Sequence, residues 1–298
     1  MGDLAERIKA SLSNRYGDPW YPELTMDLAA IAWDALQRDI GLTPDNYGTE
    51  RVLSHNLSAP RKVIASLSTS SLADTATIWI EALTQKWILH YRRKDVNFHS
   101  RAEILNTSIL ACAKDALAII NEIPSLTETV SALVRSLHLI KPQYVEYDIS
   151  FSEPHVPLSI FVSVPERRTT NDALRVAEAI VHEAMHLQLS LIENVSCLVN
   201  STNPGYFSPW RKEYRRAGGI LHGLYVFYVI HSFLGRFACI GACPKNWLRH
   251  IGQRQREIRT QLNEVRAFQD CSDLTATGSL LVQGCFKYLD MSSSTTYR

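Results

Sequence analysis

Val181-His182-Glu183-Ala184-Met185-His186 stands in the middle of a long apolar stretch. An α-helix completes a turn every 3.6 residues, so side chains four positions apart lie one above the other on the same face. His182 and His186 can therefore reach one metal ion from a single rigid helix. Glu183 points about 100° away from them, where it can act as a base beside the metal or hold a metal-bound water. The H-E-x-x-H pattern predicts a metal-binding helix.

The residues around this motif favour the metal-binding interpretation. Apolar side chains dominate the stretch before the motif, residues 173–180, and the stretch after it, residues 187–192. Two histidines and a glutamate inside a buried helix cost free energy unless they are paired or bind a metal. The alternative is a pair of core histidines that are hydrogen-bonded to their neighbours. We expect the helix to run from about residue 172 to residue 198.

The composition is that of a globular protein without a bias towards charged partners. The 298 residues are 46% apolar and 20% charged, with a formal net charge of +1. This balance excludes a strong general attraction to nucleic acids, acidic partners or membrane surfaces. No stretch reaches the ~20 uninterrupted apolar residues of a membrane span, and the polar start of the chain is unlike a signal peptide. From charge and hydropathy we expect neither nucleic-acid nor membrane partners. The six cysteines form no C-x-x-C pair, so we expect reduced thiols in a cytoplasmic protein.

The first 140 residues are predicted to be all-helical. Apolar residues recur at helical spacing in five segments, at about 4–12, 22–39, 74–92, 102–122 and 126–139. The polar segment 43–60 is predicted to form a loop. The histidines of this half stand apart from one another, and we expect surface or capped side chains rather than metal ligands. They are His55, His90, His99 and His138.

Two short strands are predicted directly before the metal helix. Residues 144–151 alternate apolar and polar side chains, and residues 158–164 are more apolar. We expect them to pair as a small antiparallel sheet. After the metal helix, residues 221–237 predict a buried helix, residues 244–269 a charged helix whose arginines face solvent, and residues 278–289 a last helix.

These elements predict a mainly α protein of the α+β class. The expected architecture is a helical bundle-like domain with a small antiparallel β element before the metal helix. Because no internal repeat or low-complexity linker interrupts the chain, we expect one domain over residues 1–298. Its helical N-terminal half, about 1–140, would support a metal-binding catalytic half, about 141–298.

A third metal ligand is needed, because a catalytic metal usually takes three protein ligands and keeps other positions open. The metzincin pattern is excluded, since Leu189 and Ile192 occupy the positions of its glycine and third histidine. Glu193 lies two helical turns beyond His186, and Glu213 is a weak candidate. His222 is favoured, because it follows two glycines at the start of a buried helix, where close packing is possible. The alternative for His222 is a polar residue at a helix start.

Three motifs together are similar to the HExxH-motif domain family. They are His182-Glu183-x-x-His186, Ser208-Pro209-Trp210-Arg211 and Arg215-x-x-x-Gly219-x-Leu221-His222-Gly223. The resemblance covers about residues 155–230. Members of the family are often encoded with peptide natural-product pathways and resemble iron(II)- and 2-oxoglutarate-dependent peptide β-hydroxylases. This chain departs from the family at Arg216, where a proline is expected.

The resemblance implies an oxygenase that uses Fe(II) and 2-oxoglutarate to hydroxylate an unactivated carbon. The substrate would be a peptide or a derivative of an amino acid, free or bound to a carrier or leader, in natural-product biosynthesis. A facial set of three ligands, His182, His186 and His222, leaves sites open for a 2-oxoacid and dioxygen. An arginine would pair with the distal carboxylate of 2-oxoglutarate. That role falls to Arg215 first, ahead of Arg211 and Arg216.

Two other functions remain open. A zincin-type zinc metallopeptidase would use Glu183 as its general base, and the predicted strand 158–164 would pair with an extended substrate. In the oxygenase, Glu183 would only orient a ligand or a water. A metal-stabilised helical binding protein is the non-enzymatic alternative. The arginines before His222 favour the oxygenase. The third ligand favours it as well, because a peptidase more often takes a glutamate there and the best candidate in this chain is His222.

Overall fold

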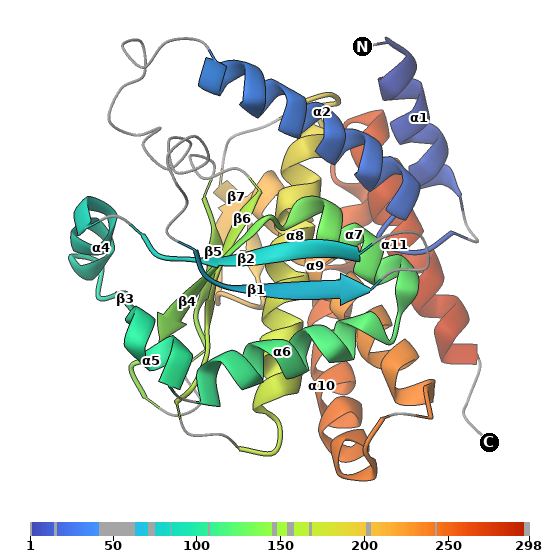
Figure 1. Cartoon of the computed structure of the whole chain (residues 1–298). Coiled ribbons are helices and arrows are strands. Elements are labelled where there is room, and N and C mark those ends of the chain that lie inside the picture. The colour runs from blue at the N-terminus through green and yellow to red at the C-terminus, as the bar shows by residue number, and fades with distance from the viewer. Residues whose placement is uncertain are drawn as a thin grey trace. The chain divides into compact units, whose positions relative to one another are not determined.

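A computed structural model describes most of the chain (Figure 1). The described residues are 2–14, 17–41, 63–70, 75–83, 85–106, 108–144, 148–153, 158–166, 169–200, 204–241 and 243–294. They form a mainly helical α+β structure, as predicted. The predicted loop 43–60 lies outside the described residues.

The chain divides into two compact units. One unit comprises Met1–Leu24 and Gln188–Arg298, and the other comprises Thr25–Leu187. Two helices, α2 (Pro22–Gly41) and α8 (Asp172–Glu193), run across the boundary between these segments. The predicted halves, about 1–140 and 141–298, stay a prediction. The expectation of a single domain stays a prediction.

The unit Thr25–Leu187 contains a mixed sheet of six strands. Its main path runs in the order β1-β2-β4-β6-β5, and β3 pairs with β4. The β2–β4 and β4–β6 pairs are parallel, whereas β1–β2, β3–β4 and β5–β6 are antiparallel. The strands are β1 (Val63–Ser70), β2 (Thr75–Glu81), β3 (Asn97–Phe98), β4 (Ser136–Lys141), β5 (Ser150–Ser152) and β6 (Ser159–Ser163). The other helices among the described residues of this unit are α4 (Gln85–Arg92), α5 (Arg101–Asn106), α6 (Ser108–Asn121) and α7 (Pro124–Leu133).

The all-helical prediction for the first 140 residues is wrong. The helix expected over residues 74–92 is a strand, β2, followed by the short helix α4, and the helix expected over 126–139 is α7 followed by β4. In β2, Ile78 and Ile80 are buried while Thr77 and Trp79 are partly exposed, which is the two-residue period of a strand. Short apolar runs satisfy the helical and the strand pattern alike, so spacing alone could not separate them.

The two strands predicted before the metal helix pair as expected. Strands β5 and β6 are antiparallel, with Phe151 opposite Phe161 and the two rings stacked at 4.6 Å. Residues 145–147 of the predicted first strand lie outside the described residues. Strand β6 has partners on both sides, β4 and β5, so it is not the edge strand that the peptidase alternative requires. Within the described sheet, β5 stands at that edge.

The unit of Met1–Leu24 and Gln188–Arg298 is built around α9 (Ala217–Cys239). Helices α10 and α11 and the hairpin β7–β8 pack against α9, and α1 packs against α11. Of the described helices, α9 is long and apolar enough to cross a membrane by length and composition, yet 72% of its most apolar window is buried inside the structure. Burial of this kind is typical of a core helix. The remaining elements are α1 (Gly2–Ser13), β7 (Pro204–Ser208), β8 (Glu213–Arg216), α10 (Lys245–Glu264), the 3₁₀ helix η3 (Arg266–Asp270) and α11 (Ala276–Ser294).

The hairpin β7–β8 is fixed to α9 by Trp210, which lies in the turn between the two strands. The Trp210 indole stacks on Phe227 of α9 with ring centroids 5.2 Å apart. It also lies so close to Gly223 that a Cβ atom at that position would come within 2.8 Å of two indole carbons. Glycine at 223 therefore permits the hairpin to approach α9 directly beside His222.

Candidate metal centre

Helix α8 begins at Asp172, whose carboxylate accepts hydrogen bonds from the backbone N–H and the hydroxyl of Thr169. A negative side chain in the first turn also interacts favourably with the helix dipole. The helix ends at Glu193 rather than near residue 198 as predicted. All three residues of the H-E-x-x-H motif lie in its middle, so a continuous ladder of backbone hydrogen bonds fixes their spacing.

The imidazoles of His182 and His186 converge through their Nε2 atoms, which lie 3.1 Å apart. The ring planes are inclined at 68°, so the two rings are not stacked. With each nitrogen about 2.05 Å from a metal ion, the 3.1 Å separation corresponds to an N–metal–N angle of about 98°. That angle lies between the ~90° of octahedral and the ~109° of tetrahedral coordination. The pair therefore suits one shared metal ion, and it equally suits one N–H···N hydrogen bond between neutral imidazoles.

Glu183 is held in place by a hydrogen bond from strand β5 of the sheet. Its carboxylate is buried, and its Oε1 accepts a hydrogen bond of 2.7 Å from the Ser150 hydroxyl of strand β5. The same oxygen lies 3.8 Å from Nε2 of His182. Although Glu183 follows His182 by 100° around the helix, its side chain is long enough to turn back towards the nitrogen that would bind the metal. This position allows Glu183 to orient a histidine or a water.

Ser150 is a functional candidate that the sequence did not reveal. The alternating pattern correctly predicts a strand at this residue, but nothing in it distinguishes Ser150 from the other polar residues of the strand. Only the antiparallel pairing of β5 with β6 brings its hydroxyl to Glu183. The hydrogen bond restrains a carboxylate that would otherwise be buried with fewer partners.

His222 lies in the first turns of α9, as expected, and its Nε2 forms a hydrogen bond of 3.0 Å with Oε2 of Glu193. Glu193 is the last residue of α8 and follows His186 by seven residues, about 10 Å farther along the same helix face. A histidine that binds a metal usually donates its other ring N–H to a carboxylate. Glu193 is placed to accept such a bond, which leaves Nδ1 of His222 for a metal. His222 belongs to the other compact unit than the histidine pair, so its membership of the metal centre stays a prediction.

The three candidate arginines lie on the hairpin and at its junction with α9. Arg211 is exposed in the turn, and Arg216 is exposed at the position that precedes the first turn of α9. Arg215 extends across Gly219, where an added Cβ atom would stand 3.4 Å from its Nε and 3.6 Å from its Cζ. Gly219 precedes His222 by one helical turn on the same face. The Arg215 side chain therefore lies along the face of α9 that carries His222.

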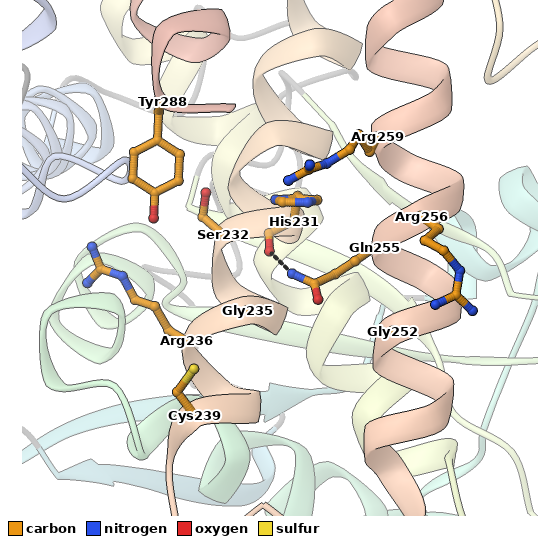
Figure 2. Close-up of a pocket in the computed structure, with 10 residues that line it drawn as sticks. All are labelled: His231, Ser232, Gly235, Arg236, Cys239, Gly252, Gln255, Arg256, Arg259 and Tyr288. Carbon is orange, nitrogen blue, oxygen red and sulfur yellow. Dashed lines mark hydrogen bonds between the residues drawn. The ribbon is translucent and has the colours of Figure 1, made fainter. Parts of the chain in front are cut away.

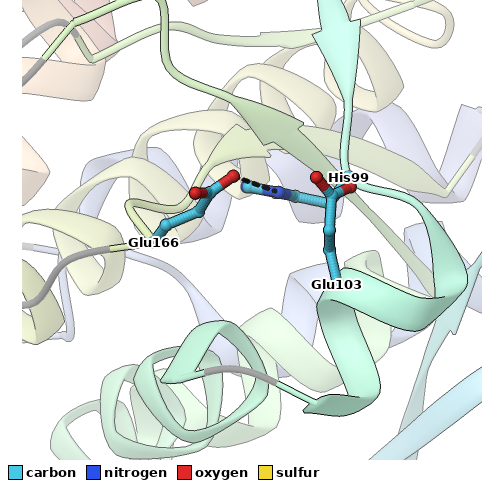
Figure 3. Close-up of side chains that lie close together, drawn as sticks. All are labelled: His99, Glu103 and Glu166. Atoms are coloured by element: carbon cyan, nitrogen blue, oxygen red, sulfur yellow. Dashed lines mark ion pairs between the residues drawn. The ribbon is translucent and has the colours of Figure 1, made fainter.

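A second group of possible metal ligands lies elsewhere in the unit Thr25–Leu187. Ligand atoms of His99, Glu103 and Glu166 all lie within 4.8 Å of one another, and Figure 3 shows His99 and Glu166 pointing towards each other. However, the ammonium group of Lys141 lies 2.8 Å from Glu103 and 2.7 Å from Glu166. These ion pairs lower the pKa of Glu103 to about 2, chiefly through the hydrogen bond from Lys141. A cation already belongs to this cluster, so it suits a structural ion network better than a metal.

The sequence predicts that the histidines of the N-terminal half are surface or capped side chains rather than metal ligands. His90 is exposed, but His99 and His138 are buried and bond to the backbone carbonyl groups of Val164 and Glu81. Burial lowers the pKa of His138 to about 4, so that imidazole is neutral at physiological pH. His55 lies outside the described residues.

The chain matches no protein-family model and no curated protein.

Proposed function

We propose that the protein is an oxygenase that depends on iron(II) and 2-oxoglutarate. Its substrate is a peptide or a derivative of an amino acid, free or bound to a carrier or leader, and it hydroxylates an unactivated carbon of that substrate. His182, His186 and His222 hold the iron. The convergence of the two Nε2 atoms of α8, 3.1 Å apart, supports two of these three ligands, His182 and His186.

The observation that carries the choice of cosubstrate is the position of Arg215 across Gly219, one turn before His222. Its Nε has an acidic neighbour at 3.5 Å, Glu213, but 59% of that glutamate side chain is exposed, and exposed ion pairs contribute little. A carboxylate of 2-oxoglutarate can therefore replace Glu213 at small cost. A guanidinium group pairs with a carboxylate through two parallel hydrogen bonds, which fixes the orientation of the cosubstrate as well as binding it.

Iron, 2-oxoglutarate and dioxygen together supply the oxidation of the unactivated carbon, and the protein side chains have supporting tasks. Glu193 accepts the Nε2–H of His222 and so fixes the tautomer and the orientation of that ring. Glu183 has the same task towards His182 or a water, and Ser150 holds it in place. Trp210, packed over Gly223, fixes the hairpin that carries Arg215.

The test is titration of 2-oxoglutarate into protein loaded with iron(II) without oxygen, followed by admission of oxygen and measurement of succinate. We expect a visible charge-transfer band on binding and succinate formation that requires iron. Arg215→Gln should raise the Kd for 2-oxoglutarate by about tenfold or more, the effect of losing a charge-assisted pair of about 1.5–3 kcal/mol. Lys212→Gln, which removes the same charge from the turn of the same hairpin, should change it less than about twofold.

If the iron-loaded protein neither binds 2-oxoglutarate nor forms succinate, alone or with candidate peptides, this proposal is wrong. If Lys212→Gln weakens binding as much as Arg215→Gln does, the hairpin acts only through its general positive charge, and the role given to Arg215 is wrong.

A zincin-type metallopeptidase is the second candidate, and one observation favours it. The buried carboxylate of Glu183 lies 3.8 Å from Nε2 of His182, where a general base is needed, and Ser150 links it to the edge strand β5. An extended peptide could pair with that edge. Cleavage of a peptide library by the zinc-loaded protein, lost in Glu183→Gln, would favour this function over the oxygenase.

A further inference from the structure

The hairpin of β7 and β8 carries six consecutive exposed residues with a high positive charge. Residues 211–216 read Arg-Lys-Glu-Tyr-Arg-Arg, and every one of them is exposed. Four cations and one carboxylate give this stretch a net charge of +3, whereas the whole chain has a net charge of +1. The other residues of the chain together carry −2, so the hairpin stands out as a local basic surface.

Three of the four cations on this hairpin have no charged partner. Within the part of the chain that the structure describes, Arg211, Lys212 and Arg216 form no ion pair, and Arg215 has only Glu213 at 3.5 Å. A group of like charges without counter-charges favours the approach of an anionic partner.

Two arginines of α9 and α10, drawn in Figure 2, are in a different situation. Arg236 pairs with Asp18 at 2.6 Å. Arg259 interacts with Asp290 of α11, which also bonds to Arg266. Carboxylates of the chain itself therefore offset these two arginines, which is not the case for the three unpaired cations of the hairpin.

Two aromatic side chains lie exposed on the same hairpin. Phe207 and Tyr214 stand opposite each other in the β7–β8 register, and their ring centroids are 5.7 Å apart. The two residues are 47% and 71% exposed. Tyr214 and Arg216 are two residues apart on β8 and so share one face of the hairpin. Exposed aromatic rings beside cations are typical of a surface that a partner covers.

The opposite face of the hairpin is anchored to the rest of its unit. Tyr206 of β7 donates a hydrogen bond of 2.9 Å to Asp273, and its ring meets that of Phe268 edge to face at 5.3 Å. Trp210 in the turn stacks on Phe227 of α9. A surface that is fixed in this way loses little conformational entropy when a partner binds.

Strand β8 offers a free backbone edge beside these side chains. Among the described strands it pairs with β7 alone, and all four of its residues are exposed. Strand β7 is the poorer edge, because it begins with Pro204, which has no N–H, and ends at the buried Ser208. An extended peptide can therefore pair with β8 as an added strand.

We propose that the hairpin docks an acidic, extended segment of a partner polypeptide, which adds a third strand beside β8. Carboxylates of the segment pair with Arg211, Lys212 and Arg216, and an apolar side chain of the segment packs on Tyr214. A single-stranded nucleic acid would also meet cations and rings, but it could not use the backbone edge. Docking needs neither metal nor 2-oxoglutarate and is independent of the oxygenase function.

Fluorescence anisotropy with the labelled octapeptide Glu-Glu-Phe-Val-Glu-Glu-Phe-Val tests the proposal on the full chain without added metal. When extended, this probe carries acidic and apolar side chains on both faces. We expect saturable one-to-one binding that weakens as the salt concentration rises. The same peptide with lysine in place of glutamate should not bind.

Variants of the hairpin and matched variants elsewhere locate the binding surface. Tyr214→Thr should weaken binding about tenfold, because an aromatic anchor is lost while the strand propensity is kept. Tyr144→Thr, at another exposed tyrosine, should change it less than about twofold. Lys212→Gln combined with Arg216→Gln should weaken it about fivefold, and Arg256→Gln, at an exposed arginine of α10, less than about twofold.

Amide hydrogen exchange provides a second readout, which reports on the backbone edge. The bound peptide should slow exchange in residues 213–216, because strand addition gives their outward N–H groups partners. Absence of saturable binding, or unchanged exchange in β8 when the peptide is bound, would overturn the proposal. So would equal losses of affinity in the hairpin variants and the matched variants. A thymidine octanucleotide that binds as tightly as the peptide would assign the surface to nucleic acid instead.

Discussion

Two groups of side chains in the unit Thr25–Leu187 have the residue types of a metal site, and they differ in their charge partners. On α8, two imidazole nitrogens converge to 3.1 Å beside a buried carboxylate. In the second group, the carboxylates of Glu103 and Glu166 both bind the ammonium group of Lys141. The first arrangement leaves two converging imidazole nitrogens that one metal ion could share, whereas the second is already neutralised by a cation from the chain itself.

The comparison teaches that proximity of ligand atoms does not by itself define a metal site. The second group brings one nitrogen and two carboxylates within 4.8 Å of one another. However, both carboxylates already form ion pairs with Lys141, which supplies the positive charge that a metal would otherwise supply. The variants below test whether the two groups differ in metal affinity and in their contribution to stability.

The largest effect is expected from His186→Ala. Loss of a group that merely orients a metal ligand costs about 10–100-fold in affinity, so loss of the ligand itself should lower the affinity for iron(II) or zinc by at least about 100-fold. Metal titration monitored by calorimetry measures this change. Glu103→Gln is the matched control in the second group and should leave the metal affinity within about twofold. A loss of affinity in Glu103→Gln and not in His186→Ala would exchange the roles of the two groups.

Glu183→Gln distinguishes the two candidate functions of the first group. Removal of the charge should lower the succinate formation of an oxygenase by about 10–100-fold and leave a measurable fraction, because the side chain only orients other groups. In a peptidase it should remove nearly all activity, since the general base would be lost. The measurement is kcat with iron and 2-oxoglutarate on one sample, and peptide cleavage with zinc on another. The amide can still accept the Ser150 hydrogen bond, so the fold is expected to survive.

Lys141→Met should convert the second group into a pair of unneutralised carboxylates. We expect a loss of about 1 kcal/mol or less in the free energy of unfolding, because all three side chains are at least one-third exposed and solvent screens their interaction. Urea denaturation measures it. If this variant gains a second metal equivalent that the native chain does not bind, Lys141 is the reason that the native cluster excludes metal; if the native chain already binds two, that explanation is wrong.

Acid should disrupt the second group with a smaller effect. The folded-state pKa of Glu103 is about 2, below its ordinary value of 4.5, so its contribution to stability is present above pH 4.5 and declines as the pH falls towards 2. Unfolding experiments across this window should show a steeper loss of stability in the native chain than in Lys141→Met. Equal slopes would mean that Lys141 is not the cause of the lowered pKa.

The sequence predicted helix α8 better than it predicted the sheet. An i,i+4 spacing of two histidines has one geometric meaning on a helix, so α8 and the convergence of His182 and His186 followed directly. The pairing of β5 with β6 also followed from alternation. Strands β2 and β4 were missed, because their short apolar runs lie next to helices and fit both periods.

The partners of the site residues could not be predicted, because they come from distant parts of the chain. Glu193 lies two helical turns beyond His186, and the structure gives it a contact that this spacing does not predict, the hydrogen bond to His222, 29 residues later. The hydrogen bond between Ser150 and Glu183 also joins residues that are distant in the sequence. So does the ion pair between Lys141 and Glu103, which no sequence motif predicts. Such contacts depend on how the elements pack, and no local spacing encodes them.

Anomalous scattering from crystals grown with iron(II) or zinc tests the central claim most directly. The account predicts one strong peak about 2 Å from Nε2 of both His182 and His186, and none at Lys141, Glu103 and Glu166. A peak at the second group, or no peak at the histidine pair in crystals saturated with metal, would contradict it.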